Sequence, residues 1–264
     1  MPNYTLITGA SSGIGYELAK VFARNGHNLL LVARREARLK ESCAQLINSF
    51  NIQALYFPCD LTSEVEIEKL FDFIRTHSLQ INYLVNNAGV GHFSLFEQSD
   101  PVKNNHLLDL NIKAVISLTH RLLPNLKNNT PSAILNISSM AAWMPGPYIA
   151  VYAATKSFVL SFSQSLASEL EDKDVQVSVL CPADVVTEFQ KHANLENFEI
   201  KESISVHELA EYTYQQFVLE HKLLIIPPDA QKKIDSMTRS GSAEVISRNL
   251  YKIRKLLANK LGIN

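Results

Sequence analysis

The sequence predicts a single doubly wound α/β domain with a seven-stranded parallel sheet. Short apolar runs alternate with amphipathic stretches as far as about residue 227, which is the pattern of βαβ units. The apolar runs are rich in branched residues and show little polar alternation, as expected of strands covered on both faces. A composition of 46% apolar and 19% charged residues, with a formal net charge of -1, is that of a globular chain. It excludes a disordered chain and a basic nucleic-acid-binding domain, so no nucleic-acid partner is expected.

The expected elements alternate along the chain. We expect strands at residues 4–8, 28–33, 54–57, 83–86, 133–137, 175–180 and 223–226. We expect helices at residues 13–26, 35–50, 63–78, 101–127, 152–172 and 206–220. At the start of the third helix, Ser63 and the glutamates that follow supply a cap and acids where the helix dipole favours them. No linker divides the chain, so residues 1–239 are expected to form one Rossmann-type catalytic domain, and residues 240–264 a helical extension packed on it.

The turn after the first strand is expected to bind a dinucleotide. The chain has only nine glycines, and three of them lie in the run TGASSGIG, which begins at Thr8. A tight strand-to-helix turn needs glycine for positive φ, and the helix that follows offers unpaired N–H groups to a pyrophosphate. The spacing differs from the common GxGxxG fingerprint, so taken alone the run is also compatible with a simple turn. The residues expected at the pyrophosphate are Gly9, Ser11, Ser12, Gly13, Ile14 and Gly15.

Two arginines follow the second strand, where a dinucleotide fold that prefers NAD usually has an acid for the ribose 2′-hydroxyl. Arg34 and Arg35 instead match a 2′-phosphate, which guanidinium groups hold by bidentate, charge-assisted hydrogen bonds. The alternative is a pair of solvated arginines at a helix start. With the glycine turn upstream, we expect NADP(H). The next two strands also end in residues expected to line this site, namely Asp60, Leu61, Asn87, Ala88 and Gly89.

The fifth strand and the helix after it carry candidate catalytic residues. Ser138 and Ser139 close the strand, and Tyr152 and Lys156 begin and end the run YAATK. Residues i and i+4 share a helix face, so the Lys156 ammonium can lie near the Tyr152 phenol and favour its anion. Lowering a phenol pKa from ~10 towards 7 requires about 4 kcal/mol, which a lysine and an oxidised nicotinamide can supply together.

In combination, these motifs resemble the short-chain dehydrogenase/reductase family. The match extends from Thr8 to Thr187 and includes TGASSGIG, the NNAG run that ends at Gly89, Asn111 in the fourth helix, Ser139 and the YxxxK pair. Each motif is weak alone, but five in order at consistent spacing make coincidence remote. The resemblance implies an oxidoreductase that transfers hydride between NADPH and a carbonyl or alcohol group of a small molecule.

The resemblance also implies roles for individual residues. Tyr152 would protonate the carbonyl oxygen, and Ser139 would hydrogen-bond that oxygen and the developing alkoxide. Lys156 would tune Tyr152 and bind the nicotinamide ribose, and Asn111 would hold a water in the proton relay. The spacing to Tyr152 favours Ser139 over Ser138, which is expected to be mainly structural.

After the sixth strand the family's Pro-Gly motif is replaced by Pro182 and Ala183, which puts the local backbone angle in doubt. Pro182 is expected at the cofactor. Val185 by its backbone and Thr187 by its hydroxyl would bind the nicotinamide carboxamide.

The expected substrate walls are mostly apolar, which favours a bulky lipophilic carbonyl such as a fatty-acyl, steroid-like or xenobiotic ketone. The alternative is that some of these side chains, Trp143 above all, pack against a partner subunit. The wall residues are His92, Phe93, Phe96, Trp143, Met144, Pro145, Pro147, Tyr148, Phe189, Leu195, Phe198 and Ile200.

The last stretch, residues 244–261, reads as a basic amphipathic helix. From Ser240 onward, five Lys and Arg residues stand against one Glu, a local charge of +4, which leaves -5 for the rest of a chain whose total is -1. Such a helix can pack on the enzyme body or a neighbouring subunit, cap the pocket, or lie on an anionic membrane surface. We favour packing.

The remaining expectations concern surroundings and partners. The N-terminal residues resemble no signal sequence, so a cytoplasmic location is expected. Cys43, Cys59 and Cys181 are expected to be buried, reduced thiols, and no metal site is expected. The family resemblance implies a homodimer or homotetramer paired through the fourth and fifth helices. A sensor or scaffold that binds NADPH without turnover is the alternative function, although a pure sensor has no need of all four catalytic residues.

Overall fold

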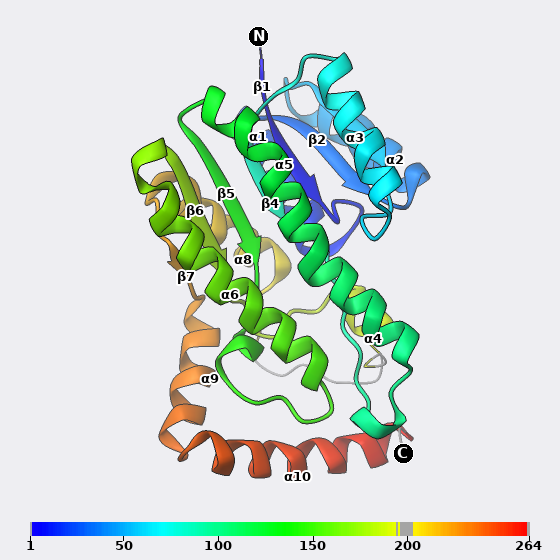
Figure 1. Ribbon diagram of the computed structural model, residues 1–264, viewed down its shortest axis with the longest axis vertical. Coiled ribbons are helices and arrows are strands. Elements are labelled where there is room, and N and C mark those ends of the chain that lie inside the picture. Colours follow the sequence, from blue (N-terminus) through cyan, green and yellow to red (C-terminus); the bar gives the residue numbers. More distant parts are fainter. Residues whose placement is uncertain (1, 194, 196–202, 263–264) are drawn as a thin grey trace.

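The computed structural model describes residues 2–193, 195 and 203–262. Seven parallel strands form a sheet in the order β3-β2-β1-β4-β5-β6-β7, which confirms the predicted fold class (Figure 1). Each strand lies within three residues of its expected bounds. The strands are β1 (Asn3–Thr8), β2 (Asn28–Ala33), β3 (Ala54–Pro58), β4 (Gln80–Asn86), β5 (Ser132–Ile137), β6 (Val175–Leu180) and β7 (Leu224–Ile225).

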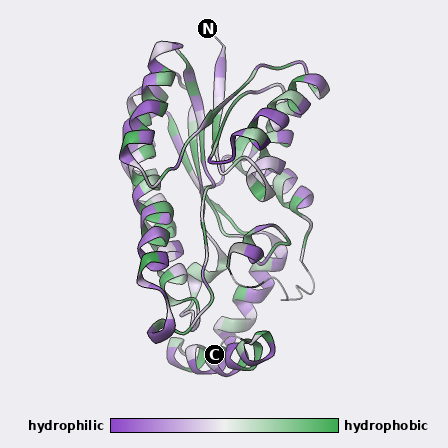
Figure 2. Cartoon of the chain, turned by 90° about the vertical axis from the view of Figure 1, so that its right-hand side faces the viewer, coloured by the Kyte–Doolittle hydropathy of each residue, from purple (hydrophilic) through white to green (hydrophobic). Residues whose placement is uncertain are grey.

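The strands are apolar throughout because helices cover both faces of the sheet. Successive strand residues point to opposite faces. In β1, Leu6 packs in one core with α3, α5 and α6, whereas Ile7 packs in the other with α1, α2 and α8. Seen from the side, the strands lie between two helical layers (Figure 2). The helices are α1 (Gly13–Arg24), α2 (Glu36–Ser49), α3 (Glu64–Thr76), α5 (Ala114–Asn128), α6 (Ala150–Leu170) and α8 (Val206–Tyr214).

The chain reverses its winding direction at β1, which pairs with β2 on one side and β4 on the other. In doubly wound sheets, ligands bind outside the carboxyl ends of the strands at such a switch point. The segments that follow the strands are therefore the ones to inspect for a site. Among them are short helical turns at Phe96–Gln98 and Met140–Trp143, and α7 (Phe189–His192); a further turn, Glu171–Lys173, lies at the other end of the sheet, between α6 and β6.

Two of the expected helices are interrupted, which corrects the sequence-based bounds. The helix expected at 101–127 consists of α4 (Pro101–Leu108), a π-helical turn at Asp109–Lys113, and α5. A second π turn, Gln215–Leu219, follows α8. A π turn holds an extra residue and shifts the side chains out of α-helical phase. Hydrophobic spacing does not reveal the first turn, because helices precede and follow it; after the second, the chain leaves the helix and enters β7 (Leu224–Ile225).

The C-terminal part contains one helix that the sequence analysis did not predict. This helix, α9 (Pro228–Arg239), precedes α10 (Ala243–Leu261), which crosses the molecule beyond the carboxyl ends of the strands (Figure 1). Ile246 and Leu250 of α10 are buried in a cluster with Met144. Through this cluster α10 contacts residues that follow β5 and β6.

The outward side of α10 exposes Val245, Ile253 and Leu256. Over the part of the chain that the structure describes, we find no helix that is both long and apolar enough to cross a membrane. All three cysteines are free and buried, as predicted.

Candidate active site

A cavity of about 610 Å³ opens at the carboxyl ends of the strands, where the topology places a ligand site. It brings together every predicted site residue except Asn111 and Gly15. The predicted residues that line it are Gly9, Ser11, Ser12, Gly13, Ile14, Arg34, Arg35, Asp60, Leu61, Asn87, Ala88, Gly89, Ser139, Tyr152, Lys156, Pro182, Val185 and Thr187.

The glycine turn is shaped for a bound anion. Gly9 and Gly13 have φ of 64° and 57°, in the left-handed region that favours glycine. Ser12 precedes α1 but makes no side-chain cap, so the N–H groups of the first turn remain available at the cavity wall. Gly15 has a packing role, since a Cβ there would lie 2.4 Å from Nδ2 of Asn87. Gly15 does not line the cavity, and its expected contact with the pyrophosphate stays a prediction.

The residues after β4 are hydrogen-bonded to Thr8, which precedes this turn. The Asn87 side chain donates to the Thr8 carbonyl at 2.9 Å, and the Asn87 and Ala88 amides donate to the Thr8 hydroxyl at 2.9 and 3.0 Å. The two loops therefore form one wall of the cavity, which explains why asparagine and threonine are needed beside the glycines.

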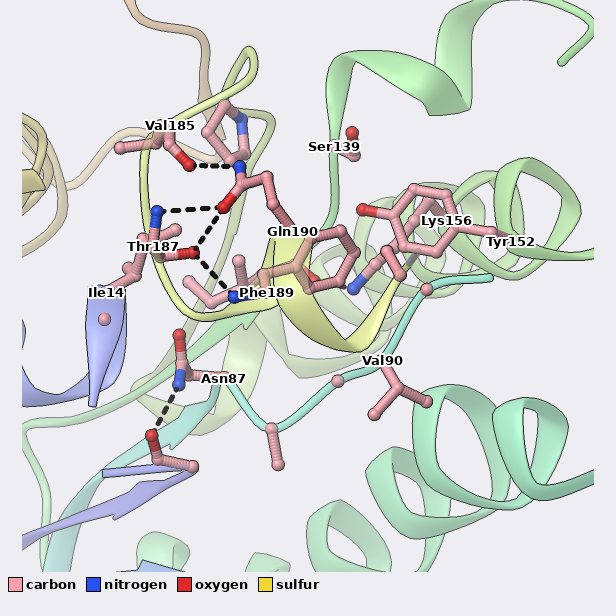
Figure 3. A pocket seen from close by; sticks show the side chains of 18 of the residues that line it. Ile14, Asn87, Val90, Ser139, Tyr152, Lys156, Val185, Thr187, Phe189 and Gln190 are labelled. Atoms are coloured by element: carbon pink, nitrogen blue, oxygen red, sulfur yellow. Dashed lines mark hydrogen bonds between the residues drawn. The ribbon is translucent and has the colours of Figure 1, made fainter. Parts of the chain in front are cut away.

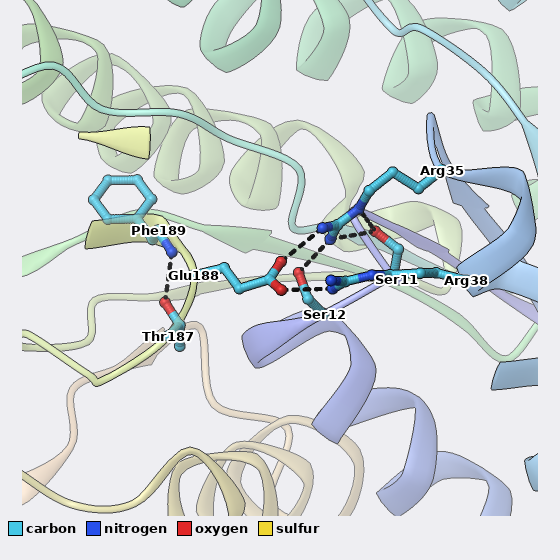
Figure 4. A network of polar contacts seen from close by, with 7 residues as sticks. All are labelled: Ser11, Ser12, Arg35, Arg38, Thr187, Glu188 and Phe189. Atoms are coloured by element: carbon cyan, nitrogen blue, oxygen red, sulfur yellow. Dashed lines mark hydrogen bonds and ion pairs between the residues drawn. The ribbon is translucent and has the colours of Figure 1, made fainter. Parts of the chain in front are cut away.

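The arginine end of the cavity, which we define as Ser11, Ser12, Arg35, Arg38 and Glu188, contains an acid that the sequence analysis did not consider. Arg35 pairs with Glu188 at 2.7 Å and donates to Ser11 and Ser12 at 3.0 and 2.8 Å (Figure 4). Arg38 pairs with the other oxygen of Glu188 at 2.5 Å. Hydrogen bonds from Arg38 and Arg35 lower the pKa of Glu188 to about 2, so its carboxylate is ionised at neutral pH.

Arg34 is exposed at the cavity rim and forms no ion pair within 4.0 Å among the described residues, although its charge helps to lower the pKa of Asp60. The two predicted arginines therefore differ in their partners. Arg34 is open to an anionic ligand, whereas Arg35 already holds one carboxylate.

The catalytic wall, defined as Ser139, Tyr152 and Lys156, is anchored in the core. Lys156 is almost fully buried and donates from Nζ to the Ile137 carbonyl of β5 at 2.9 Å. Its ammonium lies 5.7 Å from the centroid of the Tyr152 ring (Figure 3). Ser139 accepts a hydrogen bond from the Ala141 amide at 3.1 Å. The predicted proximity of these three side chains is therefore present.

The pKa of Tyr152 is raised in the chain alone, and the lowering expected from Lys156 together with an oxidised nicotinamide stays a prediction. Burial raises this pKa to about 12, with the Ser139 hydroxyl opposing the shift and Asp184 adding to it. Burial also lowers the pKa of Lys156 to about 8. In the chain alone, the loss of hydration raises the Tyr152 pKa more than the nearby Lys156 ammonium lowers it. One N–H of that ammonium donates a hydrogen bond to the Ile137 carbonyl.

Ser138 has the structural role expected of it. Its hydroxyl is buried and donates to the Lys156 backbone carbonyl at 2.7 Å, which ties β5 to α6. Both serines line the cavity, but Ser139, one residue later, is the more exposed of the two, and its hydroxyl is not bonded to the Lys156 carbonyl.

Asn111 lies in the π turn and supports the cavity from behind. Its Oδ1 accepts from the Val90 amide at 3.0 Å, and its Nδ2 donates to the Val90 carbonyl at 2.9 Å and to the Thr155 hydroxyl at 3.2 Å. The side chain thus positions the loop that carries Gly89 and Val90. Its predicted part in holding a water stays a prediction.

In the segment after β6, the Gln190 side chain bonds to Val185 and Thr187, the two residues that were expected to bind the nicotinamide carboxamide. Gln190 donates from Nε2 to the Val185 carbonyl at 2.6 Å, and its Oε1 accepts from the Thr187 amide at 2.9 Å (Figure 3). The backbone φ of Ala183 is not positive, so alanine in place of the family's glycine is compatible with this backbone.

Five of the twelve predicted substrate-wall residues line the cavity, and the charged Asp184, Lys233 and Arg254 line it as well. The five are His92, Phe93, Met144, Phe189 and Leu195. Phe96 and Trp143 are 70% and 37% exposed and do not line it, Tyr148 stacks on Phe93 behind the wall, and Pro145 and Pro147 lie outside it. The predictions for Phe198 and Ile200 concern residues outside the described chain.

Arg254 of α10 is a charged lining residue that sequence reasoning missed. It donates to the Pro147 carbonyl at 2.8 Å, and burial lowers its pKa. The pattern of basic and apolar residues in α10 did not predict that Arg254 lines the cavity, because the pattern does not show which basic side chain faces the protein. Glu188, Gln190 and Arg38 were missed for a related reason, since they become neighbours of the cavity only once the fold is known.

Comparison with known proteins agrees with this geometry. The family model for short chain dehydrogenases matches residues 3–197. A mouse relative, 17-beta-hydroxysteroid dehydrogenase type 3, is 32% identical over 198 residues, which are 74% of this chain and 64% of that protein. Sulfoacetaldehyde reductase 2 of Chromohalobacter salexigens is 33% identical over 72% of this chain and 75% of its own length.

Among solved structures, a short-chain dehydrogenase from Sphingobium yanoikuyae in complex with NADPH superposes with a TM-score of 0.81 at 33% identity, covering 91% of this chain and 94% of that one. A bulky-bulky ketone specific alcohol dehydrogenase from Comamonas testosteroni gives a TM-score of 0.76 at 30% identity, over 91% and 93% of the two chains. The chain spans just under two thirds of the mouse relative. With its motifs, its fold and these matches, the chain belongs to the short-chain dehydrogenase family.

Proposed function

We propose that the chain is an NADPH-dependent carbonyl reductase, which moves hydride between the nicotinamide and a carbonyl or alcohol carbon. The observation that carries the proposal is the convergence of Ser139, Tyr152 and Lys156 on a cavity whose other end holds the glycine turn and the arginines. The NADPH complex of the Sphingobium relative supports the choice of cofactor.

The cavity fits a nicotinamide dinucleotide. The uncapped first turn of α1 would hold the pyrophosphate, and Arg34, Arg35 and Arg38 would hold a 2′-phosphate. Val185 and Thr187 offer a carbonyl acceptor and an amide donor, which match the two ends of a carboxamide. When bound, the cofactor supplies the hydride for reduction and accepts it in the reverse direction.

The protein's own residues handle the proton. Ser139 donates a hydrogen bond to the carbonyl oxygen and stabilises the charge that develops there. Tyr152 gives that oxygen a proton, and a pKa of about 12 keeps the proton on the phenol at neutral pH until the more basic alkoxide forms. Lys156 supplies positive charge beneath the ring as the phenolate appears. These properties favour the reductive direction, because oxidation would begin from a phenolate.

The substrate that the lining favours is a bulky lipophilic carbonyl compound. Phe93, Met144, Phe189 and Leu195 offer apolar surface near Tyr152. Two similar proteins support this choice by their names, one a bulky-bulky ketone specific alcohol dehydrogenase and the other a 17-beta-hydroxysteroid dehydrogenase.

A second candidate substrate is a carbonyl compound that also carries a carboxylate or sulfonate. The observation that favours it is Arg254, whose guanidinium lies at the wall of the cavity and forms no ion pair within 4.0 Å among the described residues, although the charge of Asp184 acts on it. An anion there would receive charge-assisted hydrogen bonds.

We also propose pairing of chains through α4, α5 and α6 into a homodimer or homotetramer. Ile116 of α5 is 40% exposed, which gives this surface an apolar residue to bury. Sedimentation of the wild type against Ile116→Lys tests it, with a shift towards monomer expected for the variant. The cytoplasmic location stays a prediction.

The proposed function is tested by a panel of neutral ketones, ketoacyl thioesters and carboxylated or sulfonated carbonyl compounds, followed by NADPH absorbance. Turnover of neutral compounds supports the lipophilic substrate. Turnover confined to anionic compounds, with KM raised about tenfold by Arg254→Met, supports the second candidate. NADPH binding without turnover of any compound would favour a sensor or scaffold and contradict the proposal.

A further inference from the structure

Both ends of the proposed cofactor site are already occupied by side chains of one short segment. The segment consists of the four residues from Thr187 to Gln190, and its last two residues are the first two of α7. Its Glu188 carboxylate bridges Arg35 and Arg38, and its Gln190 carboxamide bonds to Val185 and Thr187 (Figures 3 and 4). Gln190 carries a carboxamide, as nicotinamide does. Glu188 carries an anionic group with acceptor oxygens, as the 2′-phosphate does.

The match at Gln190 extends to both ends of its amide. Val185 provides a carbonyl that accepts the Gln190 Nε2–H at 2.6 Å. Thr187 provides its amide at 2.9 Å and its hydroxyl at 3.4 Å to Gln190 Oε1. A nicotinamide carboxamide presents the same NH₂ donor and carbonyl acceptor, so the two amides compete for one set of partners.

The match at Glu188 concerns charge and geometry. Each carboxylate oxygen holds one arginine, at 2.7 Å for Arg35 and 2.5 Å for Arg38, and Ser12 contributes a further hydrogen bond. A 2′-phosphate carries more charge and more acceptor oxygens than a carboxylate, so it can replace Glu188 at these arginines. Because the Glu188 side chain is already 36% exposed, its carboxylate can return to water at small cost.

The segment also lies against the other parts of the site. A Cβ on Gly13 would lie 3.3 Å from Cβ of Thr187, so the segment touches the start of α1. Between the two polar residues, the Phe189 ring lies 5.6 Å from the Tyr152 ring. Four consecutive residues therefore contact the pyrophosphate turn, both ends of the cofactor site and the catalytic tyrosine.

We propose that Glu188 and Gln190 are internal competitors of the cofactor, which set its affinity and its selectivity for a 2′-phosphate. The inference rests on the proposed function. Glu188 competes only with a cofactor that carries the 2′-phosphate, whereas Gln190 competes with every nicotinamide cofactor. The two residues therefore act on different quantities, selectivity and overall affinity.

The experiment measures dissociation constants of NADPH and NADH by titration calorimetry for the wild type, Glu188→Gln and Gln190→Leu. Glu188→Gln should tighten NADPH about fivefold and leave NADH within about twofold. Gln190→Leu should tighten both cofactors by a similar factor, about threefold to fivefold, with their ratio unchanged. Thermal melting of each variant checks that the fold is kept.

Glu36→Gln is the matched control. Glu36 is exposed in the first turn of α2, next in the chain to Arg35, and its replacement changes the charge by the same amount without touching the Glu188 ion pairs. It should change the NADPH dissociation constant by less than about twofold. An equal gain in Glu36→Gln and Glu188→Gln would show a general charge effect and overturn the inference.

Other outcomes separate this inference from the proposed function. Unchanged or weaker NADPH binding in both Glu188→Gln and Gln190→Leu would overturn the inference and leave the proposed function in place. Failure of the wild type and every variant to bind either cofactor would overturn the proposed function, and the inference with it.

Discussion

The catalytic wall and the arginine end of the same cavity are held in place in different ways. Lys156 and Ser138 bond to backbone carbonyls of β5 and α6, and these atoms are buried. At the arginine end, Arg35 and Arg38 bond to a partly exposed carboxylate and to serine hydroxyls. Backbone partners in a packed core cannot be exchanged without unfolding, whereas side-chain partners at a solvated surface can. The catalytic wall is therefore the fixed end of the cavity, suited to chemistry, and the arginine end is the exchangeable end, suited to binding.

The largest expected effect is at the fixed end. Tyr152→Phe removes the hydroxyl that gives the proton and leaves the ring beside Phe189. We expect reduction to fall by about 10³-fold or more, with NADPH affinity within about twofold of wild type. Steady-state rates and calorimetry on the same preparation measure the two quantities. Unchanged turnover would refute the assigned mechanism.

The two adjacent serines should respond differently to the same substitution. Ser139→Ala removes the hydroxyl expected at the carbonyl oxygen, so kcat should fall about 10²-fold, with stability lowered by about 1 kcal/mol because the Ala141 amide loses its acceptor. Equal and small losses of kcat for Ser139→Ala and Ser138→Ala would contradict the assignment of Ser139.

The pH dependence of reduction follows from the burial of the catalytic wall. The pKa of Lys156 is lowered to about 8, so its ammonium loses its proton as the pH rises through 8, while Tyr152, at about 12, keeps its own. We expect kcat/KM to fall about tenfold per pH unit above 8. Lys156→Met should be slower at every pH and should lack this step. A flat wild-type profile from pH 7 to about 9.5 would exclude Lys156 as the group that titrates.

The smallest expected effect concerns stability. Ser138→Ala deletes the hydrogen bond from Oγ to the Lys156 carbonyl, and the free energy of unfolding should fall by about 1 kcal/mol. Chemical denaturation measures it. A stability equal to wild type would mean that this bond does not help to fix the catalytic wall.

The fixed end is also the part that the sequence predicts best. The strands follow from runs of branched apolar residues, and the spacing from Ser139 through Tyr152 to Lys156 follows from a strand end and one helical turn. The π turn at Asp109–Lys113 could not be predicted, because it depends on Asn111 reaching the Val90 backbone across the fold.

The exchangeable end was predicted only in part. The glycine turn and the arginines stand in a recognisable order, but Glu188 lies 153 residues from Arg35 and meets it only through the fold. Likewise, the pKa of Tyr152 depends on how much water the folded cavity excludes, which no local pattern encodes.

The central claim is that this cavity moves hydride from NADPH to a carbonyl carbon with Tyr152 as the acid. Its most direct test is mass spectrometry of the alcohol formed from NADPH that carries deuterium at the transferred position. We predict one deuterium on the carbinol carbon with the wild type, and no product above background with Tyr152→Phe. An alcohol without deuterium, or labelled alcohol formed equally fast by Tyr152→Phe, would contradict the claim.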